Sequence, residues 1–358
     1  MDDLNNIILN KINNKDIFKK LGLQQNKRIG QSLVLFGAGQ HAHYVLNGLR
    51  DAGIEPNFFC DNNPQKNGTL FEGVPVISYP VLLEKHKNSI IIITSLDYKT
   101  EIATQLKHDG LAWVDNDIIY LMEVYKDIYN KAFNLFEEEL SKRVFYERIL
   151  HCITEDPKWL IPIRSQSTQY FEKDIIKLFN DEIFIDGGAF TGDTVEEFLR
   201  QTDGKFDKIY SFEPEVSKHV DFYKVAGDSD RIKLLPYGLW SKDTLLQFDS
   251  RNTAGSMISD SGDTTIQVTS IDKTLNGKPA TFIKLDIQGA ELEALEGARE
   301  TITKYKPKLA ICVYHKTLDI VKIPIFLKSI VPQYKLYLRH YGDTVLETVL
   351  YAVADQVI

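Results

Sequence analysis

The segment IFIDGGAFTGD, residues 183–193, places three glycines directly after a short apolar strand, and the helical pattern TVEEFLRQ follows them. Glycines permit a tight turn and a close approach of the backbone to a ligand. The free N–H groups of a helix N-terminus add a partial positive charge. Because open α/β sheets bind ligands at the carboxyl ends of their strands, this segment predicts a ligand loop. The alternative is a purely structural corner between a strand and a helix.

Strand and helix patterns alternate on both sides of this loop and predict an α/β protein. In residues 181–358 they predict a doubly wound sheet that ends in an antiparallel hairpin, YKLYLRHYGD with ETVLYAV. Residues 1–120 predict a smaller Rossmann-like domain, led by a helix with Leu4, Ile7, Ile8 and Ile12 on one face. Residues 121–180 predict a helical connector, rich in aromatic and charged residues. A chain of 358 residues has room for about two domains.

Two further carboxylates end neighbouring strands of the larger domain. Glu213 ends KIYSFE, 27 residues after Asp186, and Asp286 ends TFIKLD, 100 residues after Asp186. A carboxylate at the distance of Glu213 is placed to accept hydrogen bonds from both hydroxyls of a ribose. The glycine spacing departs from G-x-G-x-x-G, which suits a ligand without a pyrophosphate. For each acid, the alternative is a helix-capping role.

Taken in order, the motifs IDGGAFTGDT, SFEP and FIKLDIQGAELEALEGA resemble the FkbM family of S-adenosylmethionine-dependent methyltransferases. The segments SIDKTL, PKLAICVYH and YLRHYGDTVLETVLY are similar to the family as well, so that the resemblance covers about residues 165–358. It implies a class I methyltransferase-like sheet and S-adenosylmethionine as cofactor. The chain has Gln288 where the family commonly has glutamate.

The resemblance also implies roles for individual residues. Asp186, Gly188 and Gly192 would line the methionine part of the cofactor, and Glu213 would bind its ribose. Asp286 would face the methyl group and the acceptor. His315 and Asp286 are the two candidates for the catalytic base, and His315 has a suitable ordinary pKa. The residues predicted to bind the cofactor are Asp186, Gly188, Ala189, Gly192, Glu213, Asp272 and Asp286; for Asp272 a strand-end turn is the alternative.

The smaller domain contains a second glycine motif. Gly37-Ala-Gly39-Gln-His-Ala follows an apolar strand, and Asp61 ends the next strand, 22 residues after Gly39. This is the dinucleotide fingerprint in outline. The segment also resembles N-terminal nucleotide-binding-like domains of enzymes that modify bacterial sugars and polysaccharides. It predicts a second nucleotide site at Gly37, Gly39 and Asp61, or a degenerate scaffold that aids acceptor binding or homodimer formation.

Composition limits the partners. The net charge of -8 argues against nucleic acid as the main partner. Three widely spaced cysteines predict no disulfide framework and a cytoplasmic location. No apolar run approaches the roughly 20 residues that span a bilayer, and the first residues do not form a signal peptide. The scattered histidines show no zinc spacing, so no metal is predicted.

Together these features predict an S-adenosylmethionine-dependent O-methyltransferase in polysaccharide biosynthesis. Its acceptor would be a small molecule or glycan: a hydroxyl of a sugar, a glycan precursor or a similar polar metabolite. Two alternatives remain. One is an oxidoreductase or epimerase that binds a nicotinamide or a nucleotide-sugar at the N-terminal glycine motif; the other is a non-catalytic binding protein.

Overall fold

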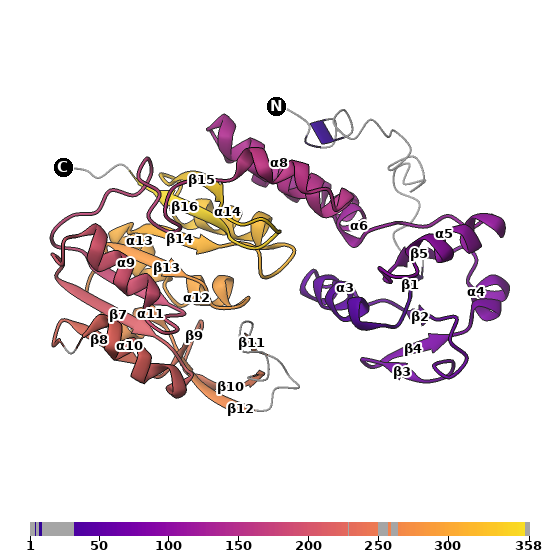
Figure 1. Ribbon diagram of the computed structural model, residues 1–358, viewed down its shortest axis with the longest axis horizontal. Coiled ribbons are helices and arrows are strands. Elements are labelled where there is room, and N and C mark those ends of the chain that lie inside the picture. Colours follow the sequence, from indigo (N-terminus) through magenta and orange to yellow (C-terminus); the bar gives the residue numbers. More distant parts are fainter. Residues whose placement is uncertain are drawn as a thin grey trace. The chain divides into compact units, whose positions relative to one another are not determined.

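The computed structural model describes residues 4, 7, 8, 32–227, 229–249, 257, 258 and 264–354. Its contacts divide the chain into two compact units (Figure 1). Unit 1 comprises residues 1–130 and 149–156, and unit 2 comprises residues 131–148 and 157–358. Of the predicted leading helix, Leu4, Ile7 and Ile8 are helical, and Ile12 lies outside the described residues. No described helix combines the length and the apolar character that a bilayer span requires.

Unit 1 is built on a five-stranded sheet in the order β3-β4-β2-β1-β5, in which β3 alone runs antiparallel to its neighbour. All residues of the neighbouring strands β1 and β5 are buried, as their continuous apolar sequences predict. The elements are β1 (Leu33–Phe36), α3 (Gln40–Asp51), β2 (Phe58–Cys60), β3 (Leu70–Phe71), β4 (Val74–Ile77), α4 (Tyr79–Lys85), β5 (Ile90–Ile93) and α5 (Lys99–His108).

Three helices follow: α6 (Asp117–Val124), α7 (Lys126–Phe133) and α8 (Glu139–Thr154). The side chain of Asn116 begins α6 by accepting a hydrogen bond from the Ile118 N–H at 2.7 Å. Beyond Thr154 the α-helical structure stops, and two short 3-10 turns, η1 (Pro157–Trp159) and η2 (Ile161–Ile163), lead into an irregular segment up to residue 182. The helical pattern predicted up to residue 180 therefore ends early.

Unit 2 contains a seven-stranded sheet in the order β15-β16-β14-β13-β6-β7-β8. The sheet is parallel except for β16, which runs antiparallel to both β14 and β15. The prediction of a doubly wound sheet with an antiparallel edge hairpin is confirmed. The strands are β6 (Ile183–Gly187), β7 (Lys208–Phe212), β8 (Ile232–Leu235), β13 (Phe282–Leu285), β14 (Lys308–Cys312), β15 (Lys335–His340) and β16 (Thr348–Val353).

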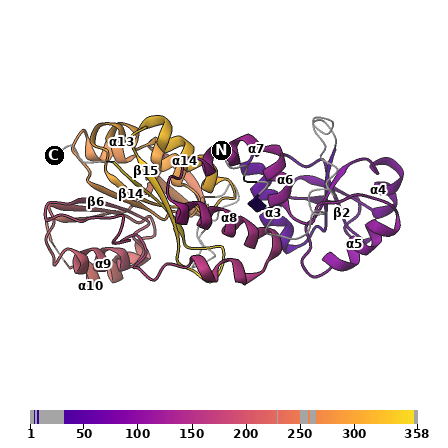
Figure 2. The same ribbon diagram turned by 90° about the horizontal axis from the view of Figure 1, so that it is seen from above.

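Helices cover both faces of this sheet. Figure 2 shows α9 (Asp193–Gln201) and α10 (His219–Ala226) on one side, and α13 (Arg299–Tyr305) and α14 (Asp319–Ile330) on the other. Under α9, the Phe184 ring stacks between Phe198 and Phe282, with ring centroids 4.6 and 5.0 Å apart. These aromatic contacts fix β6 in the middle of the sheet, with its carboxyl end at the glycine loop.

Three local predictions differ from the structure. Residues 290–305 form two helices, α12 (Glu291–Glu296) and α13, separated at Gly297, where a Cβ would lie 2.2 Å from the Trp240 carbonyl oxygen. The apolar segment RIKLLPYGLW, residues 231–240, has the pattern of one strand but forms two, β8 and β9 (Gly238–Leu239), which lie in different sheets. The helix α14 has no counterpart in the sequence analysis, because Pro324 lies inside it.

A second, four-stranded sheet in the order β11-β10-β12-β9 adjoins the first through β9. Its other strands are β10 (Thr244–Asp249), β11 (Met257–Ile258) and β12 (Thr264–Thr269), and the short helix α11 (Ile271–Leu275) follows β12. Phe248, Ile266 and Val268 form a small apolar cluster on this sheet, against which Trp240 packs. This sheet supplies apolar side chains to the site described below.

Candidate functional site

The glycine loop after β6 is held between two neighbouring strands. The N–H groups of Gly188 and Ala189 both donate to the Phe212 carbonyl oxygen on β7, at 3.1 and 3.0 Å. Gly188 has a φ of +76°, and a Cβ there would lie 1.9 Å from the Asp286 carbonyl oxygen beyond β13. Both constraints require glycine at this position. The loop backbone consequently packs directly against the segment that carries Asp286.

A buried ion pair lies beneath the loop. Lys284 on β13 is aligned with Asp186 on β6, and its Nζ lies 3.1 Å from Asp186 Oδ1. The same Nζ donates to the carbonyl oxygens of Gly187 and Gly188, at 3.0 and 2.8 Å. Burial alone would lower the pKa of Lys284, but Asp186 and Asp286 raise it above its ordinary value. Burial raises the pKa of Asp186, and the charge of Lys284 limits that rise.

Glu213 follows β7 and lies beside the loop. Its Oε2 accepts a hydrogen bond from the Phe190 N–H at 2.9 Å, and its Oε1 accepts one from the Glu215 N–H at 2.8 Å. Burial raises its pKa, an effect that these two backbone hydrogen bonds reduce. Among the described residues no lysine or arginine forms an ion pair with this carboxylate, which lines the adjoining cavity.

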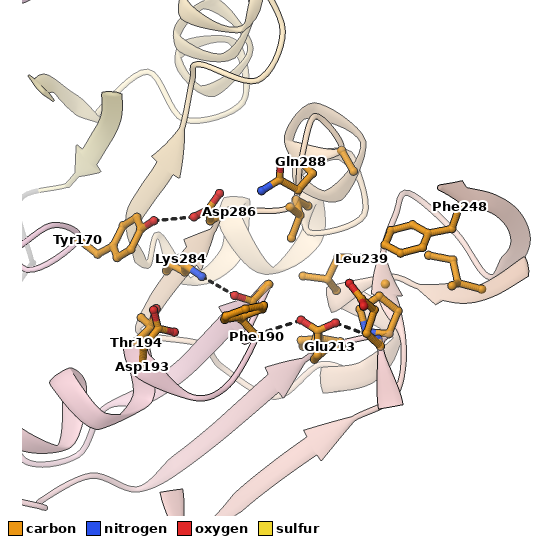
Figure 3. Close-up of a pocket in the computed structure, with 18 of the residues that line it drawn as sticks. Tyr170, Phe190, Asp193, Thr194, Glu213, Leu239, Phe248, Lys284, Asp286 and Gln288 are labelled. Carbon is orange, nitrogen blue, oxygen red and sulfur yellow. Dashed lines mark hydrogen bonds between the residues drawn. The ribbon is translucent and has the colours of Figure 1, made fainter. Parts of the chain in front are cut away.

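Loop, strand ends and second sheet enclose a cavity of about 470 Å³. Figure 3 shows Leu239 and Phe248 near Glu213, and Tyr170 on the other side of Lys284 and Asp286. The cavity therefore has an apolar part beside Glu213 and a polar part around Asp286. The residues that line it are Gln169, Tyr170, Gly188, Phe190, Asp193, Thr194, Phe212, Glu213, Pro214, Glu215, Gly238, Leu239, Phe248, Ile266, Lys284, Asp286, Ile287, Gln288, Ala290, Tyr314 and Glu347.

Asp286 is the carboxylate of the polar part. Its Oδ2 accepts a hydrogen bond from the Tyr170 hydroxyl at 2.7 Å, and its Oδ1 accepts one from the Tyr314 hydroxyl at 3.2 Å. Burial would raise its pKa, but Lys284, His315 and the two tyrosine hydroxyls hold the pKa below its usual value. Asp286 is therefore ionised at neutral pH, and both of its oxygens have fixed orientations.

Tyr170 comes from the irregular segment before β6, which the C-terminal hairpin anchors. The Tyr170 N–H donates to the Tyr351 hydroxyl at 3.0 Å, and the Tyr341 hydroxyl donates to Glu172 at 3.0 Å. Tyr170 has a φ of +68°, an unfavourable backbone conformation for this residue type. These contacts hold the phenol over the cavity and against Asp286.

His315 lies behind Asp286 and does not line the cavity. Its Nδ1 is 2.8 Å from Glu291 Oε1, and its Nε2 is 3.4 Å from Asp286 Oδ1. Among the described residues, these three form the group whose ligand atoms lie close enough together, within 4.8 Å, to be considered for a metal ion. The Nδ1 contact is a hydrogen bond, whereas Nε2 lies within ion-pair distance of Asp286 without forming a hydrogen bond.

Several residues predicted to bind the cofactor lie elsewhere. Gly188, Glu213 and Asp286 line the cavity, whereas Asp186 is fully buried beneath the loop. Ala189 is buried, and Gly192 begins α9 with a φ of +91°. Asp272 caps α13, since its two carboxylate oxygens accept the backbone N–H groups of Glu300 and Thr301 at 2.9 and 2.8 Å. Asp272 thus has a structural role in capping a helix, which differs from the strand-end turn given as the alternative.

The second predicted site lies in unit 1. Asp61 Oδ2 accepts the Ala38 N–H at 2.9 Å and lies 3.0 Å from Lys66 Nζ, which also donates to the Ala38 carbonyl oxygen at 2.8 Å. Gly37 has a φ of +114°, and Gly39 directly precedes α3. The carboxylate expected to bind a ribose is therefore engaged with its own loop and with a lysine.

Sequence reasoning missed Lys284, Tyr170, Tyr314 and Glu291. Lys284 had a signal: it is a charged residue in the apolar run Phe282–Leu285, between two strands that are buried as well. A lysine in such a strand requires a buried acceptor, and Asp186 on the neighbouring strand provides one. Tyr170 had no local signal, because the chain reaches the cavity there through an irregular segment.

Two family models match the chain. Residues 186–344 match the model described as "Methyltransferase FkbM domain", and residues 30–120 match "C2185-like, N-terminal". No curated protein matches. The first match supports a methyltransferase that uses S-adenosylmethionine.

Among solved structures, the chain is similar to the methyltransferase FkbM from Methylobacillus flagellatus KT, with 21% identity over 98% of this chain and 99% of that one, and a TM-score of 0.60. At that identity the similarity concerns the fold. Also found are a fibrillarin from Aeropyrum pernix in complex with S-adenosyl-L-methionine (12% identity, 51% and 71% coverage, TM-score 0.33) and an O-methyltransferase family protein from Burkholderia thailandensis (10%, 67% and 72%, 0.32).

The cavity residues fit such a cofactor. The apolar side chains of Leu239, Phe248 and Ile266 offer a surface for a flat base, and the Glu213 carboxylate suits the hydroxyls of a ribose. Gly188 lines the cavity, and the absence of a side chain there allows the loop to pack against the Asp286 backbone beside it.

Proposed function

We propose that this chain, whose residues 186–344 match the model of the FkbM methyltransferase domain, transfers the methyl group of S-adenosylmethionine to a hydroxyl of a sugar, a glycan precursor or a similarly polar metabolite. The observation that carries the proposal is the ionised Asp286 carboxylate in the polar part of the cavity. A carboxylate there can accept a hydrogen bond from a hydroxyl and then take its proton.

The surroundings of Asp286 support a polar acceptor. Gln169, Gln288 and Glu347 line the same cavity and offer amide and carboxylate groups to several hydroxyls. Gln288 has a φ of +55°, and this backbone conformation lies at the turn that follows Asp286. An amide at this position keeps hydrogen-bonding capacity without adding a second negative charge beside Asp286.

In the proposed reaction, Glu213 and the loop backbone hold the cofactor, and Asp286 aligns the acceptor hydroxyl. The cofactor supplies a methyl group on a sulfonium sulfur, which keeps the electron pair when its bond to the methyl carbon breaks and the new oxygen–carbon bond forms. The hydroxyl proton passes to Asp286. Tyr170 and Tyr314 limit the freedom of that carboxylate, so that less orientational entropy is lost during transfer.

The test is methyl transfer from S-adenosylmethionine labelled in its methyl group to a panel of nucleotide-sugars and free sugars. We expect an alkali-stable methyl ether on at least one of them, and loss of at least about 100-fold in turnover for Asp286→Asn, as is typical for a group that takes part in proton transfer. The same panel includes carboxylic acids and amines of similar structure. Label that appears only on these compounds would contradict a hydroxyl acceptor.

A binding measurement separates the cofactor from the acceptor. S-adenosylhomocysteine should bind at one site in calorimetric titration, and Asp286→Asn should retain most of that affinity. Tyr337→Phe, on the C-terminal hairpin and outside the lining of the cavity, serves as the matched control and should match the unsubstituted chain in both assays. Absence of S-adenosylhomocysteine binding would contradict the proposed site.

We also place this reaction in the cytoplasm and in polysaccharide biosynthesis. None of the three cysteines, Cys60, Cys152 and Cys312, forms a disulfide, which is the usual state in a reducing compartment. Fractionation of cells that express the chain, with and without osmotic release of other compartments, tests the location.

A further inference from the structure

A carboxylate–imidazole–carboxylate chain lies behind the wall of the cavity. It runs from Asp286 through His315 to Glu291, with contacts of 3.4 Å at Nε2 and 2.8 Å at Nδ1. The side chains of His315 and Glu291 are 7% and 0% exposed, whereas Asp286 reaches the cavity. His315 therefore contacts the site through Asp286.

Glu291 fixes two neighbours at once. Its Oε1 accepts the Ile287 N–H at 2.9 Å as well as facing His315 Nδ1. The first contact holds the turn directly after Asp286, and the second holds the imidazole ring. A single buried carboxylate thus determines where both the backbone and the side-chain partner of Asp286 lie.

The two contacts favour a positively charged imidazole. A neutral ring donates at one nitrogen only, and only the imidazolium donates at both. Here Nδ1 is hydrogen-bonded to Glu291 Oε1, and Nε2 lies 3.4 Å from Asp286 Oδ1, within ion-pair distance but without a hydrogen bond. The other ionisable groups around the ring are Tyr314 and Lys316 on its own segment and Asp319 at the start of α14. Burial lowers the pKa of His315, but Glu291, Asp286 and Asp319 outweigh it and raise the pKa above its ordinary value.

We propose that Glu291 and His315 are positioning residues: Glu291 holds His315 as an imidazolium, and His315 in turn orients the Asp286 carboxylate toward the acceptor. The inference rests on the proposed function and assigns the proton-accepting role to Asp286 alone. A doubly protonated ring has no lone pair with which to take a proton from the acceptor, so His315 is not the base.

The test is nitrogen NMR of the full chain labelled in its histidine rings and saturated with S-adenosylhomocysteine. The His315 signals are assigned by their loss in His315→Gln. At pH 7.5 we expect both ring nitrogens to be protonated. Glu291→Gln should lower the apparent pKa of His315 by more than about one unit, which is the effect of a charge within hydrogen-bonding distance. Glu293→Gln, on the same helix, is the matched control and should leave it unchanged.

Two further measurements distinguish a positioning role of Glu291 and His315 from a purely structural one. Should Glu291→Gln fail to fold, Asp286→Asn removes the other carboxylate and should also lower the pKa of His315. His315→Gln should raise the pKa of Asp286, because a neighbouring positive charge is lost. Carboxyl carbon NMR measures this pKa, and a histidine with a merely structural role would leave the pKa of Asp286 unchanged.

A neutral His315 at pH 7.5, or a pKa that ignores both carboxylate substitutions, would overturn the inference. So would replacement of a ring proton by added zinc or magnesium ions. Failure of the proposed function is distinguishable, because it appears as absent S-adenosylhomocysteine binding or absent methyl transfer, whichever charge His315 carries.

Discussion

The two glycine loops of this protein use the same local arrangement with different results. In unit 1, Asp61 accepts the Ala38 N–H of the loop and the Asn63 N–H two residues further along the chain. In unit 2, Glu213 accepts the Phe190 N–H of the loop and the Glu215 N–H, again two residues further along. Each carboxylate therefore ties a strand end to a neighbouring loop.

The two carboxylates differ in their third neighbour. Asp61 has Lys66 at 3.0 Å, and hydrogen bonds from Asn63, Ala38 and Lys66 lower its pKa against the effect of burial. Glu213 has the cavity instead, and burial raises its pKa. A lysine beside the carboxylate provides an ion-pair partner within the protein, whereas a carboxylate that faces a cavity can bind a ligand. Pattern and spacing alone cannot distinguish these cases.

The largest expected effect is the loss of stability on replacing the lysine that pairs with the acid at each glycine loop, Lys284 in unit 2 and Lys66 in unit 1. Lys284→Met should destabilise unit 2 by about 3–5 kcal/mol, because it leaves the buried Asp186 carboxylate unpaired. Lys66→Met should cost about 0–1 kcal/mol, since that side chain is 38% exposed. Chemical denaturation, with hydrogen exchange to identify the unit that unfolds, measures both. Equal losses would show that the two ion pairs are equivalent.

The next largest effect is the difference in stability between alanine substitutions of the two loop glycines. Gly188→Ala should cost about 2 kcal/mol or more, from a left-handed backbone and a collision with the Asp286 carbonyl oxygen. Gly39→Ala should change stability by no more than about 0.5 kcal/mol, because nothing lies within 4 Å of the added Cβ. Thermal unfolding and S-adenosylhomocysteine affinity test this pair; a Gly188→Ala variant with full affinity would contradict the packing argument.

The carboxylates should differ in binding. Glu213→Gln should weaken S-adenosylhomocysteine binding about 10- to 100-fold, the range for hydrogen bonds to a charged acceptor. Asp61→Asn should leave that affinity unchanged and affect only unit 1. Calorimetric titration of both variants with S-adenosylhomocysteine measures these affinities. An equal loss of affinity in Asp61→Asn would contradict the assignment of cofactor binding to unit 2 alone.

The smallest effect is a pH dependence. Because burial raises the pKa of Glu213, S-adenosylhomocysteine affinity should fall as the pH drops through that raised value, and Glu213→Gln should abolish the change. The pKa of Asp61 is lowered, so its contribution to stability is present above its ordinary pKa of about 3.9 and is lost as the pH falls through the lowered value. Titration calorimetry at several pH values distinguishes the two.

Sequence pattern was sufficient for the sheet of unit 2 and for two carboxylates that line the cavity, Glu213 and Asp286. Apolar strands that end in Asp186, Glu213 and Asp286 predict parallel neighbours whose carboxyl ends meet, and the observed order places β6 between β7 and β13. The FkbM resemblance and its cofactor are supported by the family match. These features depend on local periodicity and on glycine and acid spacing, which are properties of short segments.

Long-range packing assigned the remaining roles. Asp186 lies beneath the loop, where it pairs with Lys284, its aligned neighbour across the sheet. Asp272 caps a helix because α13 begins beside it. Tyr170 reaches Asp286 from 116 positions away in the sequence, held by the C-terminal hairpin. Whether a carboxylate meets a lysine, a backbone N–H or a cavity depends on which distant segments pack against it. Residue type and spacing identify the acids, and the folded neighbours determine what each one binds.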